Sequence, residues 1–197
     1  MNNLDRLAMN LPFREWTIDG VVKKYYKDYF QRLAGGTFLE IGCGNGAGAK
    51  VIKKYFSPQK ITAIDLDPFM ISLAKRNVHD SSIIFEIKDA TKLTYQTGQF
   101  DAVFDFITIH HIPGPQWQDC LNEIYRVLRP GGLLFIYDIS IERFETFIGQ
   151  VLKRLTVHPY DSMYKRDEFI DFLQKLNFKI IKKEFFGRFF LTVVEKP

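Results

Sequence analysis

The residues with the clearest chemical meaning in this sequence are three glycines that alternate with small residues in the stretch Gly42-Cys43-Gly44-Asn45-Gly46. The apolar run before them, Thr37–Ile41, has the length of a buried strand and carries the acidic Glu40, and a helical pattern begins at Ala47. The glycines therefore occupy a strand-to-helix turn. Because glycine has no β-carbon, the backbone can turn sharply there and a ligand can contact it. The stretch predicts a crevice for a bound cofactor.

Aspartates lie at or near the ends of the four other predicted strands: Asp65, Asp89, Asp105 and Asp138. In an open, doubly wound sheet the ligand lies at the carboxyl ends of the strands, where the strand order reverses. Asp65 stands about twenty residues past the glycine turn, and its two carboxylate oxygens suit the two hydroxyls of a ribose. Each aspartate is also a candidate helix N-cap or turn former. That interpretation is the stronger one for Asp105 and Asp138 and stays open for Asp89.

Alternating strands and helices must position these residues. Apolar runs of strand length predict five strands, at Thr37–Ile41, Lys60–Ile64, Ile83–Ile87, Phe100–Ile107 and Leu133–Tyr137. Helical patterns lie between most of them, at Ala47–Phe56, from Pro68 (capped by Asp67) to Asn77, and at Trp117–Leu128, with a turn at Arg129–Gly132. This alternation predicts a parallel sheet that is covered on both faces.

The two ends of the chain follow different patterns. We predict an irregular arm over residues 1–17 and then a helix that is capped by Asp19 and runs to Ala34. After Asp138, helical segments at Ile141–Leu155 and Asp167–Leu176 precede two strand-like runs, Phe178–Phe185 and Phe189–Val194, which predict an antiparallel hairpin.

The predicted fold class is α/β, with a doubly wound, mostly parallel, seven-stranded, Rossmann-like sheet that ends in a C-terminal antiparallel hairpin. A length of 197 residues fits one domain. We divide it into an N-terminal arm and helix (1–36) that is a possible lid, a cofactor-binding core (37–138), and C-terminal helices with the hairpin (139–197).

Composition narrows the classes of partner. A net charge of +4 is mildly basic, and the lysines are dispersed in pairs, which is typical of solvated faces and makes a nucleic-acid partner improbable. No apolar run is long enough to cross a bilayer, and the first residues lack the pattern of a secretory signal. We therefore expect a cytoplasmic protein whose two cysteines, Cys43 and Cys120, are reduced, with peripheral membrane contact left open.

Two classes of cofactor compete for the glycine turn. The stretch Gly42–Ala47 matches the fingerprint of dinucleotide-binding proteins, which alone is weak evidence. It also matches a pattern in which an acidic residue, here Glu40, precedes alternating glycines by two positions. The dinucleotide interpretation is disfavoured because no tyrosine is followed four residues later by lysine and because the chain leaves no room for a separate substrate domain.

The second pattern resembles the seven-stranded (class I) S-adenosylmethionine-dependent methyltransferases, in the small-molecule branch that includes the ubiquinone-biosynthesis enzymes. The resemblance runs from about Thr37 to Asp138. It rests on five matches in the family's order, at Leu39–Gly46, Ala63–Pro68, Lys88–Ala90, Phe100–Val103 and Leu128–Gly132.

The resemblance implies a set of contacts to S-adenosyl-L-methionine. The methionine half of the cofactor would lie against the stretch that begins at Glu40 and continues with the turn residues Gly42, Cys43, Gly44 and Gly46. It further implies that Asp65 binds the ribose hydroxyls, Leu66 lies on the adenine face and Asp89 accepts from the adenine amino group. Ala90 would supply backbone near the ring, and Phe104 and Asp105 would border the methionyl end.

The acceptor would approach the segment after the fourth strand, where His110 and His111 are adjacent. A neutral imidazole accepts a proton readily near neutral pH, so we hypothesise that one of them is a general base. The competing interpretation is a packed, hydrogen-bonded histidine that fixes the loop. Asp105 and Asp138 alone make a poor metal site, so we predict no metal.

The segment after the fourth strand also lacks the Asn/Asp-Pro-Pro-aromatic motif of methyltransferases acting on nucleic-acid bases or protein glutamines. The predicted function is therefore methyl transfer to a small-molecule or lipid-like acceptor by in-line displacement. A non-catalytic S-adenosylmethionine-binding protein or subunit, and a less favoured NAD(P)-binding oxidoreductase, remain the alternatives. Aromatic and histidine side chains outside the shared core are candidates for the wall of an apolar acceptor pocket: Phe13, Trp16, Tyr25, Phe144, Phe147, His158 and Tyr160.

Overall fold

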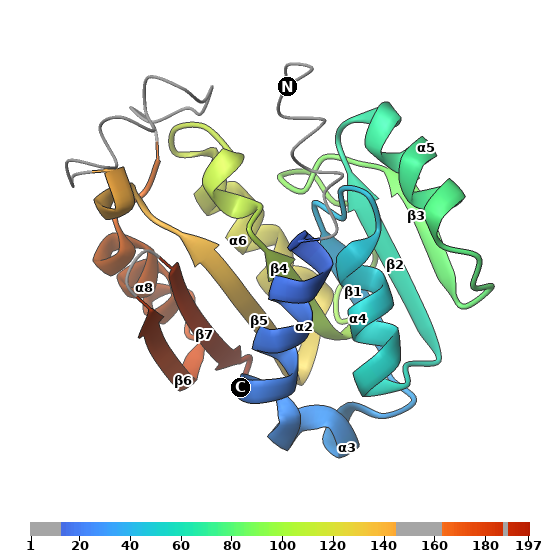
Figure 1. The fold of residues 1–197 in the computed structure, drawn as a ribbon. Helices are drawn as coiled ribbons and strands as arrows, with labels where there is room; N and C mark the ends of the chain where they lie inside the picture. Colours follow the sequence, from blue (N-terminus) through green and yellow to red (C-terminus); the bar gives the residue numbers. More distant parts are fainter. Residues whose placement is uncertain (1–12, 145–162, 187–188) are drawn as a thin grey trace.

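One sheet organises the protein, whose computed structural model describes residues 13–144, 163–186 and 189–197. The sheet has seven strands in the order β3-β2-β1-β4-β5-β7-β6, and the order reverses between β1 and β4 (Figure 1). The strands are β1 (Thr37–Ile41), β2 (Lys60–Asp65), β3 (Ile83–Ile87), β4 (Phe100–Phe106), β5 (Leu128–Ile139), β6 (Lys179–Phe186) and β7 (Phe189–Glu195).

The first five strands are parallel, and β7 runs antiparallel to both β5 and β6. This arrangement confirms the predicted fold class and the C-terminal hairpin. The paired register places Glu40 opposite Ala63 on β2 and Phe104 on β4, so Glu40 lies on an inner strand with a partner on each side.

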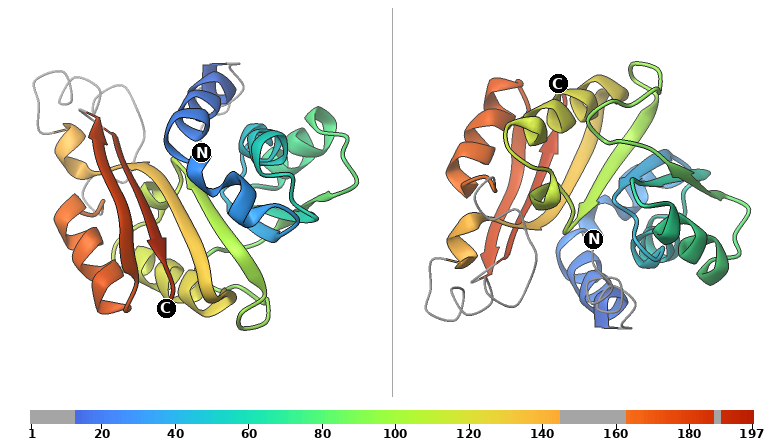
Figure 2. Two further views of the ribbon diagram at one scale, coloured as in Figure 1. Left: turned by 90° about the horizontal axis from the view of Figure 1, so that it is seen from below. Right: turned by 90° about the horizontal axis from the view of Figure 1, so that it is seen from above.

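Helices cover both faces of the sheet. The helices in the described ranges are α2 (Phe13–Tyr25), α3 (Phe30–Leu33), α4 (Ala47–Phe56), α5 (Pro68–Asn77), α6 (Gln116–Val127) and α8 (Arg166–Lys175), with the short 3₁₀ helices η1 (Lys27–Tyr29), η2 (Ile109–His111) and η3 (Ile141–Phe144). Helices α2, α4 and α5 pack on one face and α6 and α8 on the other (Figure 2).

The two faces bury separate apolar clusters because side chains alternate along each strand. Phe38 of β1 faces α4, whereas Leu39 and Ile41 face α6. Under α2 and α4 the core is aromatic: the ring of Phe104 stacks on Phe135 at 4.7 Å between centroids and meets Phe56 edge-on at 5.2 Å. Residues on the middle strands are therefore held rigidly up to the point where each strand ends.

The N-terminal prediction was wrong in two respects. Helix α2 begins at Phe13, inside the expected irregular arm, and Asp19 lies within it instead of capping it. The reason is tertiary: the Asp19 carboxylate accepts from Lys54 Nζ (2.6 Å) and Tyr55 OH (3.1 Å) on α4. The helix also stops at Tyr25, because Tyr26 leaves helical geometry and its hydroxyl donates to the carbonyl of Ile136 (3.2 Å).

Two further expectations need correction. The turn predicted at Arg129–Gly132 is instead the first part of β5, with a register irregularity opposite Phe100–Ala102. The backbone there pairs with Lys196, whose amide donates to Gly132 and whose carbonyl accepts from Gly131. The helix predicted at Ile141–Leu155 begins as η3, and its residues from 145 onward lie outside the described ranges.

Candidate functional site

The glycine turn joins β1 to α4 at the point where the strand order reverses. Gly42 and Gly46 have φ values of +62° and +87°, which side chains with a β-carbon rarely adopt. A β-carbon on Gly42 would lie 2.1 Å from Cγ2 of Thr108, and the Thr108 hydroxyl donates to the Gly42 carbonyl (3.2 Å). The turn is thus packed directly against the loop that follows β4.

Asp65 ties the same turn to the end of β2. Its Oδ2 accepts from the Gly44 amide and its Oδ1 from the Asp67 amide, both at 2.9 Å. Partial burial raises the pKa of Asp65, and these two amide donors oppose the effect. Each carboxylate oxygen keeps a lone pair for a further donor, so Asp65 can both form the turn and bind a diol.

Glu40 is buried beneath the turn. Its side chain is 2% exposed and packs against Gly48 of α4, where a β-carbon would lie only 1.9 Å from Oε1. Within the described part of the chain, Glu40 Oε2 has no hydrogen-bond partner. Burial raises the pKa of Glu40 to about 8, and the nearby Arg14 opposes this rise. A buried carboxyl group with an unused oxygen is suited to bind a cationic group, which would favour its ionised form.

Arg14 is a candidate that the sequence analysis missed. It lies at the start of α2, and its Nη2 donates to the carbonyl of Phe106 at the end of β4 (2.9 Å). Burial lowers the pKa of Arg14, while the nearby carboxylates of Glu40 and Asp65 raise it. The sequence carries no motif around Arg14, because only the packing of α2 across the sheet brings the guanidinium to these carboxylates.

The raised pKa of Glu40 predicts a pH-dependent stability. The folded protein holds this proton more tightly than the unfolded chain, so the stabilisation is complete below the unfolded value near 4.5 and is lost as the pH rises through about 8. We expect the free energy of unfolding, relative to the Glu40→Gln variant, to fall by on the order of a few kcal/mol from about pH 5 to pH 8. Denaturant titrations of both proteins across this pH range measure the free energy of unfolding. The same pH dependence in both proteins would contradict the prediction.

Two carboxylates at the ends of β4 and β5 are fully buried. Asp105 Oδ1 accepts from the amides of Thr108 (3.1 Å) and Ile109 (3.3 Å). Asp105 is therefore a turn former, which is the second role that the sequence analysis gave it. Burial and the neighbouring Asp138 raise the pKa of Asp105 well above its usual range. Asp138 is hydrogen-bonded to the ring of His110, with 2.6 Å between Oδ1 and Nδ1.

The two histidines occupy different environments. His110 is 1% exposed and bonded to Asp138, which is the packed and hydrogen-bonded histidine of the competing interpretation. His111 is exposed, and its ring lies 3.9 Å from that of His110 between centroids. Of the two, His111 is the one that an acceptor can reach.

The other predicted site residues are distributed unevenly. Leu66, directly after Asp65, is 68% exposed. Asp89 accepts from the amide (2.9 Å) and hydroxyl (2.7 Å) of Thr91, so it forms a turn. Phe104 has its side chain in the aromatic core and offers only backbone to the crevice.

Two residues are set back from the surface. Ala90 is half-buried beside the apolar cluster under α6. Cys43 is buried, and burial raises the pKa of its thiol.

The proposed walls of an acceptor pocket are only partly described. Trp16 is 80% exposed, and Tyr25 packs on Phe186 at 4.7 Å between ring centroids. Phe147, His158 and Tyr160 lie outside the described residues, as do the side chains of Phe13 and Phe144.

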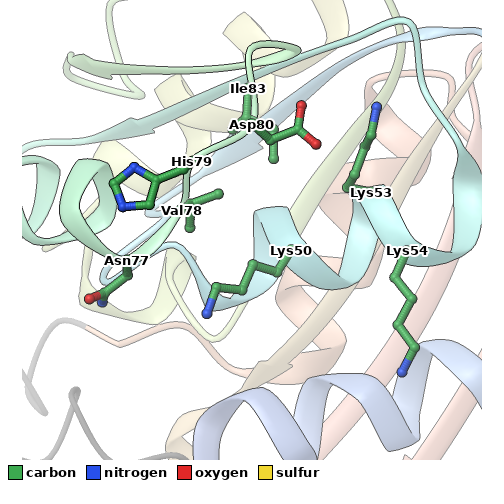
Figure 3. Close-up of a pocket in the computed structure, with 8 residues that line it drawn as sticks. All are labelled: Lys50, Lys53, Lys54, Asn77, Val78, His79, Asp80 and Ile83. Atoms are coloured by element: carbon green, nitrogen blue, oxygen red, sulfur yellow. The ribbon is translucent and has the colours of Figure 1, made fainter.

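A shallow pocket of about 340 Å³ lies on the flank between α4 and the end of α5 (Figure 3). Its walls include three lysines of α4, but each has a partner: Lys50 pairs with Glu15, Lys53 donates to Ser82 and Lys54 pairs with Asp19. The pocket contains none of the predicted cofactor residues and is a charge-paired surface depression.

The described residues form neither a metal centre nor a membrane-spanning helix. Over residues 13–144, 163–186 and 189–197, no three His, Cys, Asp or Glu side chains form a group that could hold a metal ion. None of the helices in those ranges combines the length and the apolar character needed to cross a bilayer.

A glycine turn at the reversal of strand order, with an aspartate at the end of the next strand, defines an α/β protein that binds a nucleoside-containing cofactor. Comparison with known proteins gives the class. A family model described as "Methyltransferase domain" matches residues 39–136.

Individual proteins agree with the family model. The fatty-acid O-methyltransferase of Mycolicibacterium smegmatis is 34% identical over 113 residues, which cover 57% of this chain and 40% of that protein. The ubiquinone biosynthesis O-methyltransferase of Xanthomonas oryzae pv. oryzae is 30% identical over 151 residues, which cover 71% of this chain and 61% of that protein.

Among solved structures, an S-adenosylmethionine dependent methyltransferase from Mesorhizobium loti matches with a TM-score of 0.74 at 15% identity, covering 91% of this chain and 100% of that one, which shows the shared fold. Residues 39–136 thus match a methyltransferase domain, and the chain has the seven-stranded fold of that S-adenosylmethionine dependent methyltransferase. It spans less than two thirds of the length of either curated relative.

Proposed function

We propose that this chain transfers a methyl group from S-adenosylmethionine to a small-molecule or lipid-like acceptor. The observation that carries the proposal is the hydrogen bond from the Gly44 amide to Asp65 Oδ2. This bond joins the glycine turn to a carboxylate at the end of the neighbouring strand. This pairing suits an adenosyl group, whose ribose hydroxyls need acceptors and whose chain needs close contact with the backbone.

The charges near the turn fit the methionine end of the cofactor. A β-carbon at Gly42 would fill space that Thr108 already borders, so the turn admits no side chain there. Glu40 has a buried oxygen without a hydrogen-bond partner among the described residues, which suits the α-ammonium group. Arg14, whose charge acts on Glu40 and Asp65, suits the α-carboxylate.

The remaining contacts follow the family pattern. In this proposal Asp65 binds the ribose hydroxyls, and the exposed Leu66 lies on the adenine face. Asp89 accepts from the adenine amino group while it holds Thr91, and Ala90 offers backbone near the ring. Asp105 and the backbone of Phe104 border the methionyl end.

The main contribution of the protein to methyl transfer is the alignment of the reacting groups. When bound, the cofactor supplies a methyl carbon on a positively charged sulfur, so the leaving group is already activated. The chain must align the acceptor and exclude water, which contributes several kcal/mol through proximity alone. A general base is required only where the acceptor has to lose a proton.

For a hydroxyl acceptor we propose that His111 is that base. Replacing His111 with alanine is expected to lower kcat by about 100-fold, the lower end of the range typical of general-base catalysis, with unchanged affinity for S-adenosylmethionine. Steady-state kinetics at saturating cofactor measure the change. His79→Ala is the matched control, because His79 is also exposed but lines the pocket between α4 and α5. Equal turnover in the two variants would remove His111 from the mechanism.

The acceptor class rests on the names of two relatives, a fatty-acid and a ubiquinone-biosynthesis O-methyltransferase. Exposed apolar side chains on α2 and α5, Trp16 and Phe69, are compatible with an apolar acceptor. A screen with methyl-labelled cofactor over phenols, quinols, fatty acids, amines and phospholipids tests the proposal. We expect transfer to at least one hydroxyl or carboxyl acceptor. Cofactor binding without transfer to any acceptor would instead favour a non-catalytic binding protein.

A further inference from the structure

A buried polar cluster lies in the otherwise apolar layer under α6 and α8. It consists of His110 of η2, Asp138 of β5 and Tyr164, which lies just before α8, and all three are at most 2% exposed. Tyr164 packs between Trp117 and Phe169, with ring centroids 5.5 and 4.4 Å away. Polar groups in such surroundings are costly unless each has a partner.

Asp138 connects the cluster through four polar contacts. Its Oδ1 lies 2.6 Å from His110 Nδ1 and accepts from the Ile139 amide (2.8 Å). Its Oδ2 accepts from the His110 amide (3.0 Å) and from the Tyr164 hydroxyl (2.7 Å). Three donors, two amides and a hydroxyl, already surround the two oxygens, and such surroundings favour an ionised carboxylate.

This pattern fixes the proton on one ring nitrogen of His110. A carboxylate that is already ionised has no hydrogen to donate, so the hydrogen between Asp138 and His110 belongs to Nδ1. The neighbouring Asp105 has its second oxygen buried without a hydrogen-bond partner among the described residues. Burial and the nearness of Asp138 both raise the pKa of Asp105, which disfavours a second negative charge in this layer.

The cluster also determines where the neighbouring histidine lies. Both the backbone and the ring of His110 are held by Asp138, and the ring of His111 lies 3.9 Å away between centroids at an interplanar angle of 39°. His111 is exposed at the carboxyl end of β4, one helical turn after Thr108, which contacts the glycine turn. Any shift of His110 therefore moves His111 relative to the cofactor site.

We infer that Asp138 and Tyr164 are positioning residues, which lock His110 and through it orient His111 toward the acceptor. The inference rests on the proposed function, in which the hydroxyl proton of the acceptor moves to His111. In that step the acceptor oxygen forms the new bond to the methyl carbon, and the sulfur keeps the electron pair of the bond that breaks. Tyr164 lies outside the family match at residues 39–136, so this role belongs to the C-terminal part of the chain.

Tyr164→Phe is the decisive variant and Tyr26→Phe its matched control. Tyr26 is equally buried and its hydroxyl donates to the Ile136 carbonyl, but it packs on the opposite face of the sheet. We expect Tyr164→Phe to lower kcat for a hydroxyl acceptor about tenfold, with KM for S-adenosylmethionine within about twofold of wild type, because only the alignment of the base is disturbed. Tyr26→Phe should change neither constant. Equal kcat in the two variants would overturn the inference.

A spectroscopic measurement tests the same inference without turnover. In ¹⁵N-labelled protein we expect His110 to carry its hydrogen on Nδ1, with a downfield, slowly exchanging resonance that moves in Tyr164→Phe and is lost in Asp138→Ala but is unchanged in Tyr26→Phe. A hydrogen on Nε2 alone would overturn the inference even if methyl transfer is observed. Conversely, absence of transfer in wild type with the Nδ1 resonance intact would count against the proposed function and not against the locked histidine.

Discussion

Replacing Asp65 with alanine is expected to lower the affinity for S-adenosylmethionine by about 100- to 1,000-fold. Two charge-assisted hydrogen bonds to the ribose, each about 1.5 to 2 kcal/mol at the lower end of the usual range, account for a loss of this size. The variant also releases the Gly44 and Asp67 amides that Asp65 holds at 2.9 Å, so the turn loses its shape as well as its partner. Equilibrium dialysis with labelled cofactor measures the affinity.

The matched control for this variant is Asp101→Ala. Asp101 also accepts a backbone amide, that of Thr37 (2.7 Å), and pairs with Arg129, but it lies near the beginnings of β1 and β4, away from the turn. We expect its cofactor affinity to equal that of wild type. If Asp65→Ala retained affinity within about threefold of wild type, a difference of less than 1 kcal/mol, Asp65 would be a turn former only.

Replacing Gly42 with alanine is expected to destabilise the fold by about 2 to 5 kcal/mol. A left-handed conformation costs a residue with a β-carbon about 1 to 2 kcal/mol, and overpacking adds about 1 to 3 kcal/mol. Here φ is +62° and the new carbon would lie 2.1 Å from Thr108 Cγ2. Chemical denaturation measures the free energy of unfolding, and cofactor binding should be lost in parallel.

Two further variants separate these causes. Gly20→Ala is the control, because Gly20 lies on the exposed side of α2 with nothing within 4 Å of a new β-carbon, and alanine there is expected to stabilise by up to about 1 kcal/mol. Thr108→Ala removes the two nearest atoms and should recover part of the loss in the double variant with Gly42→Ala. If the losses in unfolding free energy of the two single variants were additive in the double variant, the contact with Thr108 would not contribute to the destabilisation by Gly42→Ala.

Much of the cofactor half of the sheet follows from local signals in the sequence. Glycines flank β1 and open α4, so the predicted limits Thr37–Ile41 and Ala47–Phe56 are confirmed. The Asp67-Pro68 pair gives the start of α5, and the Asp67 carboxylate accepts from the Phe69 amide as an N-cap does. Such signals act within a few residues and need no tertiary context.

Features created by packing across the sheet were not predictable. Asp19 looks like an N-cap in sequence but bonds to α4. The charge of Arg14 acts on Glu40 only because α2 packs on this face of the sheet. Phe104 is a candidate site residue by motif, yet alternation along β4 turns its ring into the core. The bond between Tyr164 and Asp138 joins residues from separate elements, and no spacing rule points to it.

Calorimetric titration of the wild-type chain with S-adenosylmethionine, and in parallel with NADH and NADPH, tests the central claim most directly. We predict saturable binding of one S-adenosylmethionine per chain, competition by S-adenosylhomocysteine, and no heat from either dinucleotide. Binding of a dinucleotide in the absence of S-adenosylmethionine binding would contradict the assignment of the glycine turn, Glu40 and Asp65 to an adenosyl sulfonium.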